Sequence, residues 1–325
     1  MANEVEKYNL LALSDIEKIN GLTDDNIEKL NGFEFSGIVI QKGIFAFGNK
    51  PSNTVVNESN LVTTVGVIGT DVTGVGTDRS RPGGSEYGTG TAIMAFGNDG
   101  SYTAVSNLIN TSGVVASDVS GVGTARQNSA GVNYGGDKGV IAYGYASGGN
   151  QNVSNLVNNS GVVSSDVSGV GTARGSVDGT EYGGDKGIFG FGYLTGVTNL
   201  VSNSGVVASD TSAVGTARTQ PAACAYGTDK GIFAFGSSAG GQTGVSNLVN
   251  NSGVVASDTS AVGSTRQALG ATEYGVDLGI FCYGYASWPT HVNHRNLVNN
   301  SGVIASDATG AGTARWGPAA CAYGT

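Results

Sequence analysis

The stretch AACAYGTDKGIFAFG, residues 222–236, consists of two short apolar runs joined by the turn TDKG (228–231). We expect the glycine of this turn to provide the positive φ that a tight hairpin requires. In the second run, GIFAFG (231–236), apolar side chains occupy both faces of an extended chain, which is typical of a strand buried on both sides. The first run is rich in Ala, Cys and Gly, which suits a crowded place where strands converge. The stretch therefore predicts a hairpin inside a layered β structure.

The second run recurs six times, and each copy ends in an aromatic residue followed by glycine. The closing glycines lie 44 to 49 residues apart. An Asn follows each of them, an Asp comes eleven residues later, an Arg eight after that, and a Tyr eight after the Arg. The repeated charged residues are Asp71, Asp118, Asp166, Asp210, Asp258 and Asp307, with Arg79, Arg126, Arg174, Arg218, Arg266 and Arg315. These unchanging spacings identify a repeat protein.

Each repeat carries four short β-type runs, which in the fifth copy are residues 222–227, 231–236, 245–251 and 253–258. Four strands in a repeat of this length, arranged around an axis, are typical of a β-propeller blade. We predict an all-β fold, a six-bladed β-propeller of four-stranded blades over residues 35–325. Seven blades, or a partial seventh, are the alternative count. A β-solenoid is the alternative architecture, but its coils are usually shorter and lack this hairpin turn.

The run TARTQPAACAYGTDKGIFAFG (216–236) resembles a kelch blade, in which an Arg-led first strand turns back into an apolar strand ending in glycine. The similarity extends from about residue 37 to residue 325, although the kelch Gly-Gly doublet and later Trp are absent. SDVSGVGTAR (117–126) also resembles the Asp-box of sialidases, without its Trp. The resemblance implies a kelch-like propeller fold, and it does not imply an enzymatic activity.

Ring closure depends on which segment pairs with GIFAFG at residues 43–48. The chain ends in PAACAYGT (318–325), a first strand with no second strand after it. FSGIVI (35–40) competes for the same place, because QKG (41–43) would make a tight hairpin. We expect the C-terminal segment to close the ring, since otherwise a strand edge stays open.

Residues 1–34 differ from the repeats and are predicted to form a docking or cap segment. The phrases DIEKINGL (15–22) and NIEKLNGF (26–33) recur 11 residues apart. Ser14 with Glu17 makes a capping box and the glycines suit helix C-caps, so we expect two brief helical turns in a partly helical extension. A helix-hairpin-helix DNA module is an alternative that the acidic charge opposes. The phrases resemble a segment found near the N-termini of tailed-bacteriophage virion proteins, which implies docking onto other virion proteins.

The composition limits the classes of partner. A net charge of −9 repels phosphate backbones, so nucleic acid is not an expected partner. No apolar run reaches the ~18 residues of a membrane helix, and we expect no signal peptide, because residues 1–34 lack a basic segment followed by an apolar stretch. The odd number of cysteines, all within apolar runs, indicates core residues and no disulfides: Cys224, Cys282 and Cys321. We expect synthesis in a host cytoplasm and residence in the virion, without membrane insertion.

No motif of catalytic chemistry is present, so we expect no catalytic residues, no metal and no cofactor. The only histidines, His291 and His294, share a loop, but no Cys or carboxylate in that loop completes a metal site. The Asp and Arg rows are interpreted as structural residues that satisfy turns or bridge blades.

Differences between the copies indicate where binding occurs. The interval from a closing glycine to the next repeat Asn varies from 7 to 12 residues, whereas the interval from Arg to the next closing glycine is always 18. Variation is therefore confined to one loop of each repeat, on one face of the ring. The sixth of these loops is the richest in aromatic residues, and its candidate binding residues are Tyr285, Trp288, His291 and His294.

Together these features predict a non-enzymatic structural or adhesion protein. The expected role is a bacteriophage virion accessory protein of the tail, neck or fibre, whose propeller binds proteins or host-surface glycans. A cellular, lectin-like carbohydrate-binding propeller is an alternative. A glycan-cleaving enzyme that uses loop carboxylates is a further one.

Overall fold

Strands and their connections make up the described part of the computed structural model, with one 3-10 helix, η3 (Pro51–Asn53), and no α-helix among the described residues. The structure describes residues 41–324 apart from 213, 261, 288 and 289, together with six two-residue strands in the first 34 residues. The chain divides into two compact units, Met1–Val39 and Ile40–Thr325. The predicted all-β class is confirmed.

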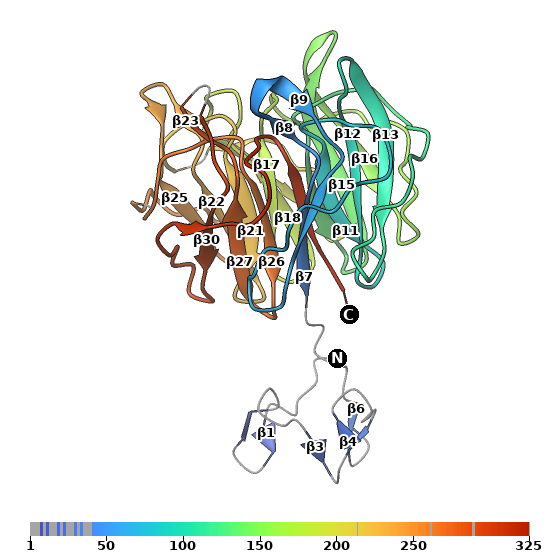
Figure 1. Cartoon of the computed structure of the whole chain (residues 1–325), viewed down its shortest axis with the longest axis vertical. Coiled ribbons are helices and arrows are strands. Elements are labelled where there is room, and N and C mark those ends of the chain that lie inside the picture. The colour runs from blue at the N-terminus through green and yellow to red at the C-terminus, as the bar shows by residue number, and fades with distance from the viewer. Residues whose placement is uncertain are drawn as a thin grey trace. The chain divides into compact units, whose positions relative to one another are not determined.

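Six antiparallel sheets dominate the second unit, and each is named after its second strand (Figure 1). In each sheet the second strand lies between the first and the third. The sheets, from first strand outward, are β32 (Ala319–Tyr323), β7 (Lys42–Ala46), β10 (Ser59–Val62); β11 (Gly83–Tyr87), β12 (Thr91–Asn98), β13 (Tyr102–Ile109); β14 (Ala130–Tyr134), β15 (Lys138–Ala146), β16 (Gly149–Val157); β17 (Asp178–Tyr182), β18 (Lys186–Gly190), β19 (Val197–Val201), β20 (Thr211–Ser212); β21 (Ala222–Tyr226), β22 (Lys230–Ala234), β25 (Ser246–Val249); and β26 (Gly270–Tyr274), β27 (Leu278–Cys282), β30 (His294–Val298), β31 (Ala308–Thr309).

The predicted fourth run of each repeat forms no named strand, and a two-residue fourth strand, β20 or β31, begins just after it in only two of the six sheets. Elsewhere it touches the third strand at isolated bridges, such as Val249 with Val255 and Ser246 with Thr259 in the β22 sheet. Between these two bridges the Asn247 side chain donates to the Ala256 carbonyl and takes the place of backbone pairing. The prediction of four full strands per repeat is therefore wrong for the described residues of four sheets.

The second strands are buried on both faces, as their apolar pattern predicts. Ile44, Phe45, Ala46 and Phe47 of the first repeat are all 0 % exposed. Side chains on opposite faces of a second strand enter different hydrophobic clusters: Ile44 packs toward the β12 sheet and Phe45 toward the β27 sheet. Each second strand therefore holds its sheet against two neighbours.

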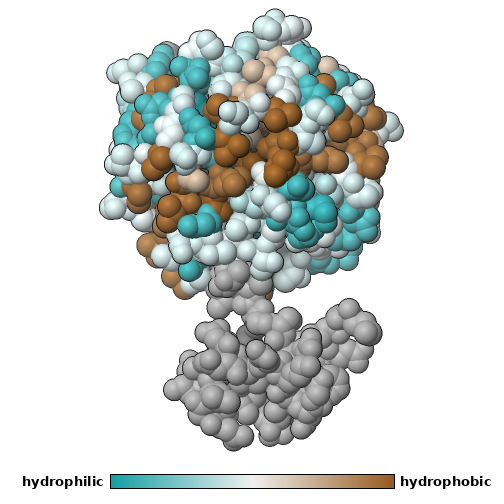
Figure 2. All heavy atoms as spheres, turned by 90° about the vertical axis from the view of Figure 1, so that its right-hand side faces the viewer, coloured by the Kyte–Doolittle hydropathy of each residue, from teal (hydrophilic) through white to brown (hydrophobic). Residues whose placement is uncertain are grey.

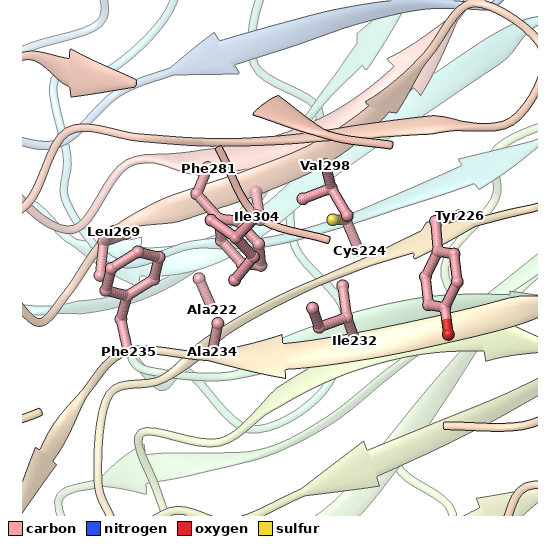
Figure 3. Packing of buried hydrophobic residues seen from close by; sticks show 11 residues of the cluster. Ala222, Cys224, Tyr226, Ile232, Ala234, Phe235, Leu269, Phe281, Val298 and Ile304 are labelled. Carbon is pink, nitrogen blue, oxygen red and sulfur yellow. The ribbon is translucent and has the colours of Figure 1, made fainter. Parts of the chain in front are cut away.

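Six hydrophobic clusters fill the spaces between neighbouring sheets. Figure 3 shows the one between the β22 and β27 sheets, where Phe235 and Cys224 face Leu269, Phe281 and Val298. The other clusters join β27 with β7, β7 with β12, β12 with β15, β15 with β18, and β18 with β22. The contacts between sheets thus follow a cycle that returns to its start.

The first strands contact one another in the same cyclic order, β32, β11, β14, β17, β21, β26 and again β32. Small residues make this approach possible. A Cβ atom on Gly131 would lie 2.1 Å from the Gly84 carbonyl oxygen of the neighbouring first strand, closer than any real contact. The Ala, Cys and Gly content of the first strands is therefore a steric requirement.

The C-terminal segment completes the first sheet. β32 pairs antiparallel with β7 along five residues, from Ala319 opposite Ala46 to Tyr323 opposite Lys42. This is the pairing expected for residues 318–325. The competing segment, residues 35–40, lies outside the described residues.

The two ends of the sheets differ. Short hairpins continue from the ends of second strands: β8 (Asn49–Lys50) with β9 (Thr54–Val55), β23 (Ser237–Ser238) with β24 (Gly241–Gln242), and β28 (Tyr285–Ser287) with β29 (Thr290–His291). Figure 1 places β8, β9 and β23 at the upper end of the sheets. Lys42, where the chain enters β7, pairs with the last residue of β32 at the other end. The variable loops thus lie opposite the point where the chain enters its first sheet.

The first unit contains three pairs of two-residue strands: β1 (Lys7–Tyr8) with β2 (Leu11–Ala12), β3 (Lys18–Ile19) with β4 (Leu22–Thr23), and β5 (Lys29–Leu30) with β6 (Phe33–Glu34). The prediction of helical turns over 15–22 and 26–33 is wrong for these described residues, and the rest of both phrases lies outside them. Two residues separate each pair, and in the second and third pairs they are Asn-Gly, the dipeptide that most favours a two-residue hairpin. The two glycines interpreted as helix caps, Gly21 and Gly32, lie outside the described residues.

Removal of residues 318–325 tests the closing strand. The truncated chain leaves β7 with an unpaired edge, so we expect aggregation or a sharply lowered melting temperature. Thermal melts and light scattering of the truncated and full-length chains measure this. A truncated chain that melts like the parent would contradict closure by β32.

Candidate functional site

The repeated Asn and Asp form one hydrogen-bonded group at the outer edge of each sheet. In the β15 sheet, Asn155 Nδ2 donates to the Ser164 carbonyl (3.0 Å) and to Asp166 Oδ1 (2.9 Å). Asp166 also accepts hydrogen bonds from the amide and hydroxyl of Thr124, which belongs to the connection between the β12 and β15 sheets. The same arrangement recurs at Asp71, Asp118, Asp210, Asp258 and Asp307. The constant Asn-to-Asp spacing is explained by this geometry.

The repeated arginines are buried between neighbouring sheets. The Arg126 guanidinium lies over the Phe96 ring of the β12 sheet, 3.7 Å from its centroid. On its other side it donates to Asn155 Oδ1 (2.7 Å) and the Tyr143 carbonyl (2.7 Å) of the β15 sheet. All six arginines are at most 1 % exposed and lie 3.7 to 4.4 Å from an aromatic centroid. The Asp and Arg rows thus lie at the contacts between sheets.

The aromatic residues under these arginines have left-handed backbones. Phe96 has φ 66° and Tyr143 has φ 61°, and the equivalent residues of the other four repeats lie between 60° and 68°. A bulky residue in this region costs on the order of 1–3 kcal/mol, so the surroundings must hold it there. In four of the six repeats the carbonyl oxygen of this residue accepts the Nε–H of an arginine. For example, Arg79 bonds the Phe96 carbonyl and so stabilises the backbone conformation that places the Phe96 ring under Arg126 of the next repeat.

Burial and pairing shift the titration of these groups. Burial lowers the pKa of Arg126 to about 10, although the charge of Asp166 opposes the shift. Burial also raises the pKa of Asp166, but the hydrogen bonds from Thr124 and Asn155 and the charge of Arg126 outweigh it and leave the pKa below its ordinary value. Both groups therefore stay charged at neutral pH.

Two rings of backbone hydrogen bonds join all six sheets. One passes through six residues with φ between 51° and 62°, each of which donates its N–H to the carbonyl of the residue before it in the ring. Its members, in order, are Arg81, Asn128, Ser176, Gln220, Ala268 and Gly317, and Arg81 donates to Gly317 (2.8 Å). The other ring is at the opposite end, where glycines after the repeat tyrosines donate to the next sheet: Gly88, Gly135, Gly183, Gly227, Gly275 and Gly324.

The first strands enclose a cavity of about 110 Å³ that is lined by acidic residues. Three of them, Glu86, Glu181 and Glu273, occupy the same position in alternate first strands β11, β17 and β26. The intervening strands carry Asn133, Ala225 and Ala322 at this position. A fourth carboxyl, Asp178, accepts the backbone N–H of Ala223 (2.8 Å).

These carboxyls resist ionisation. Burial raises the pKa of Glu86 to about 7 and that of Asp178 to about 7. Burial, followed by the charge of Glu86, raises the pKa of Glu273 to about 8. Burial and then the charges of Glu273 and Glu86 raise the pKa of Glu181 well above its ordinary value. Within the described residues, no group of three or more His, Cys, Asp or Glu is placed to hold a metal ion.

Two of the predicted sixth-loop residues, Tyr285 and His291, lie opposite each other in the β28–β29 hairpin. Tyr285 turns toward its neighbours, because its ring packs edge-on against Trp316 (5.8 Å) and its hydroxyl accepts a hydrogen bond from Gln267. His294 begins β30, with Nδ1 3.8 Å from Asp307. His291 ends β29, and Trp288 lies outside the described residues.

The outer edges of the sheets expose valines. One valine in each repeat, seven residues after the repeat Asn, is 50 % to 64 % exposed: Val67, Val114, Val162, Val206, Val254 and Val303. Figure 2 shows hydrophobic residues forming a band across one side of the molecule. Such an edge suits contact with other proteins.

Sequence reasoning did not find the acidic cavity. Its signal is the phrase EYG in alternate repeats, at residues 86–88, 181–183 and 273–275. A glutamate in every second copy does not by itself indicate a shared site, because the sequence does not show which side chains of different copies lie close together. That alternate copies face one cavity follows only from the cyclic arrangement.

No family model matches this chain, and no curated protein matches it. Among the described residues, no helix is long and apolar enough to cross a membrane.

Replacement of a repeat arginine tests the contact between sheets. Arg126→Met leaves the Tyr143 carbonyl and Asn155 Oδ1 without their donor, so we expect a loss of about 3 kcal/mol or more in the free energy of unfolding. Lys138→Met is the matched control, because Lys138 pairs with Asp137 at the surface. Chemical denaturation measures both, and equal midpoints for the two variants would contradict the role assigned to Arg126.

The acidic cavity predicts an unusual dependence of stability on pH. A carboxyl whose pKa is raised by folding binds its proton more tightly in the folded state, so stability falls as pH rises from about the unfolded pKa through the folded one. For Glu86 and Glu273 this window runs from about pH 4.5 to pH 7–8. The triple variant Glu86→Gln, Glu181→Gln, Glu273→Gln should melt at a higher temperature than the wild type at pH 8 and at the same temperature at pH 5. If the melting temperatures of the two proteins change with pH in parallel, burial does not raise the pKa values of these carboxyls.

Proposed function

We propose that the chain is a six-bladed, kelch-like β-propeller that acts as a non-enzymatic binding scaffold. The cyclic order of sheet contacts, the pairing of β32 with β7, and the two rings of backbone hydrogen bonds support this architecture. A frame with six buried arginines and interlocked backbones has little freedom to move. Loops of variable length at one end of such a frame are suited to binding.

The scaffold serves in a bacteriophage virion as an accessory protein of the tail, neck or fibre. The resemblance of residues 1–34 to virion docking segments motivates this role. The placement of the variable loops supports it, because they lie at the end of the sheets opposite Lys42, where the chain enters β7. Attachment through the first unit would leave the loop end free to bind a host-surface glycan or protein. The exposed valines provide a further surface for virion neighbours.

A binding role is better supported than glycan cleavage. The carboxyls with raised pKa values, which a glycosidase would need, line a cavity of about 110 Å³. Pockets for small molecules usually measure about 300–1,000 Å³, so a sugar ring does not fit beside these carboxyls. The cellular lectin-like role requires the same loop surface and differs only in what the first unit attaches to.

The composition of virus particles tests the proposal. Full-length chain and a variant lacking residues 1–34 are supplied during phage growth, and purified particles are probed with an antibody against the repeats. We expect incorporation of the full-length chain only, with both proteins melting alike, because residues 1–39 form a separate compact unit. Absence of the full-length chain from the particles would contradict the virion role and favour the cellular one.

A further inference from the structure

The first sheet differs from the other five in the way its first two strands are connected. In the other five sheets, a turn of three residues joins the first strand to the second. In the first sheet, β32 and β7 come from opposite ends of the described chain and are held together by their pairing alone. β32 can therefore separate from β7 without the unpairing of any other sheet.

A carboxyl of the acidic cavity contacts both segments that meet in this sheet. Glu86, in the neighbouring strand β11, accepts the backbone N–H of Ala322 in β32. Glu86 also accepts a hydrogen bond from the side-chain amide of Gln41, the residue before β7 (3.4 Å). Glu273 accepts the N–H of Ala225, which is the equivalent residue of β21. The state of the cavity carboxyls therefore bears directly on the position of β32.

The groups around the three glutamates provide little compensation for their charge. Of the described lining residues, Arg81 is the one cation, and it belongs to the ring of backbone hydrogen bonds at the other end of the first strands. The remaining titratable lining residues are Asp178, Cys224 and Cys321. Lysines begin four of the second strands, and three of these pair with a neighbouring aspartate at the surface: Lys42, and Lys138, Lys186 and Lys230 with Asp137, Asp185 and Asp229.

The other groups beside the glutamates stay neutral in the range where the glutamates titrate. Burial raises the pKa of both cavity thiols, Cys224 and Cys321, well above the ordinary value. Burial also raises the pKa of the repeat tyrosines that follow the three glutamates: Tyr87, Tyr182 and Tyr274. Ionisation of the glutamates therefore places like charges in one small cavity, without a change of charge on these neighbours.

Protonation of the cavity and attachment of β32 are thereby coupled. The pKa values of Glu86 and Glu273 in the folded chain are about 7 and about 8, against an ordinary value of 4.5. Groups with a raised pKa stabilise the closed arrangement fully below the ordinary value, and this contribution is lost as pH rises through the folded value. Separation of β32 opens the cavity to water and relieves the repulsion.

We propose that Glu86, Glu181 and Glu273 form a pH-sensitive switch, which holds β32 against β7 in acidic solution and releases it in mildly alkaline solution before any other sheet unpairs. Release leaves the edge of β7 open to pairing with another strand. β32 is the strand that responds because the other five first strands remain tethered to their partners by short turns.

The chain contains an internal control for this release. Residues 222–227 and 319–324 share the sequence AACAYG, and they place Cys224 opposite Ile232 and Cys321 opposite Ile44. Both thiols are buried, with exposures of 3 % and 7 %. The two cysteines differ in that a turn joins the strand of Cys224 to its partner, so release of β32 exposes Cys321 and leaves Cys224 covered.

The experiment treats the full chain with N-ethylmaleimide at pH values from 6 to 9 and measures the labelling rate of each cysteine by peptide mass spectrometry. The ratio of the Cys321 rate to the Cys224 rate cancels the intrinsic pH dependence of the thiol reaction. The wild type is compared with the triple variant Glu86→Gln, Glu181→Gln, Glu273→Gln and with the single variant Glu181→Gln. Asp137→Asn is the matched control, because Asp137 is a surface carboxyl paired with Lys138.

We expect the ratio to rise about tenfold or more between pH 6 and pH 9 in the wild type and in Asp137→Asn, and to stay constant in the triple variant. In Glu181→Gln the rise should be smaller. Glu181 lies in β17, between β14 and β21, so its effect on Cys321 reports the charge in the cavity and not a lost bond to β32. This single variant decides the matter if the triple variant does not fold. A ratio that does not change with pH in the wild type, or one that rises equally in both glutamine variants, would overturn the proposal.

Discussion

The buried arginine between each pair of neighbouring sheets is the interaction on which the rest of the structure depends. A guanidinium without water is costly unless all of its donors and its face are used. Arg126 uses them by stacking on Phe96 and by donating to Tyr143 and Asn155 of the next sheet. The stacking recurs at all six contacts, and at five of them the guanidinium also donates to the next sheet. Because such a contact requires two sheets at a set distance, it constrains the angle between them.

Crowding at the first strands leaves buried carboxyl groups without the hydrogen-bond partners that the buried arginines have. The strands approach so closely that glycine and alanine dominate, and the remaining space is a small cavity. Glu86, Glu181 and Glu273 are placed there with few donors, so burial holds their pKa values above the ordinary range.

The proposed function uses the parts of the repeat that are free to differ. Residues of the sheet contacts recur in all six copies, since a change in one alters the fit of two sheets. The loops that follow the second strands differ in length between copies, and variable loops on a rigid frame are suited to recognition.

The sequence by itself determined the all-β class, the repeat and the doubly buried second strands, because these follow from local periodicity and from the constant spacings within the repeat. It left two segments competing to pair with residues 43–48, and the structure shows the pairing of β32 with β7. It was misleading for residues 15–33, where helical turns were expected and short paired strands are observed. The sixth loop was chosen for its composition, but whether Tyr285 faces solvent or Trp316 depends on a residue 31 positions away. Only the tertiary structure decided which residues share the acidic cavity. The cavity is built across neighbouring sheets, and a linear pattern contains no distance between segments that meet only in the folded chain.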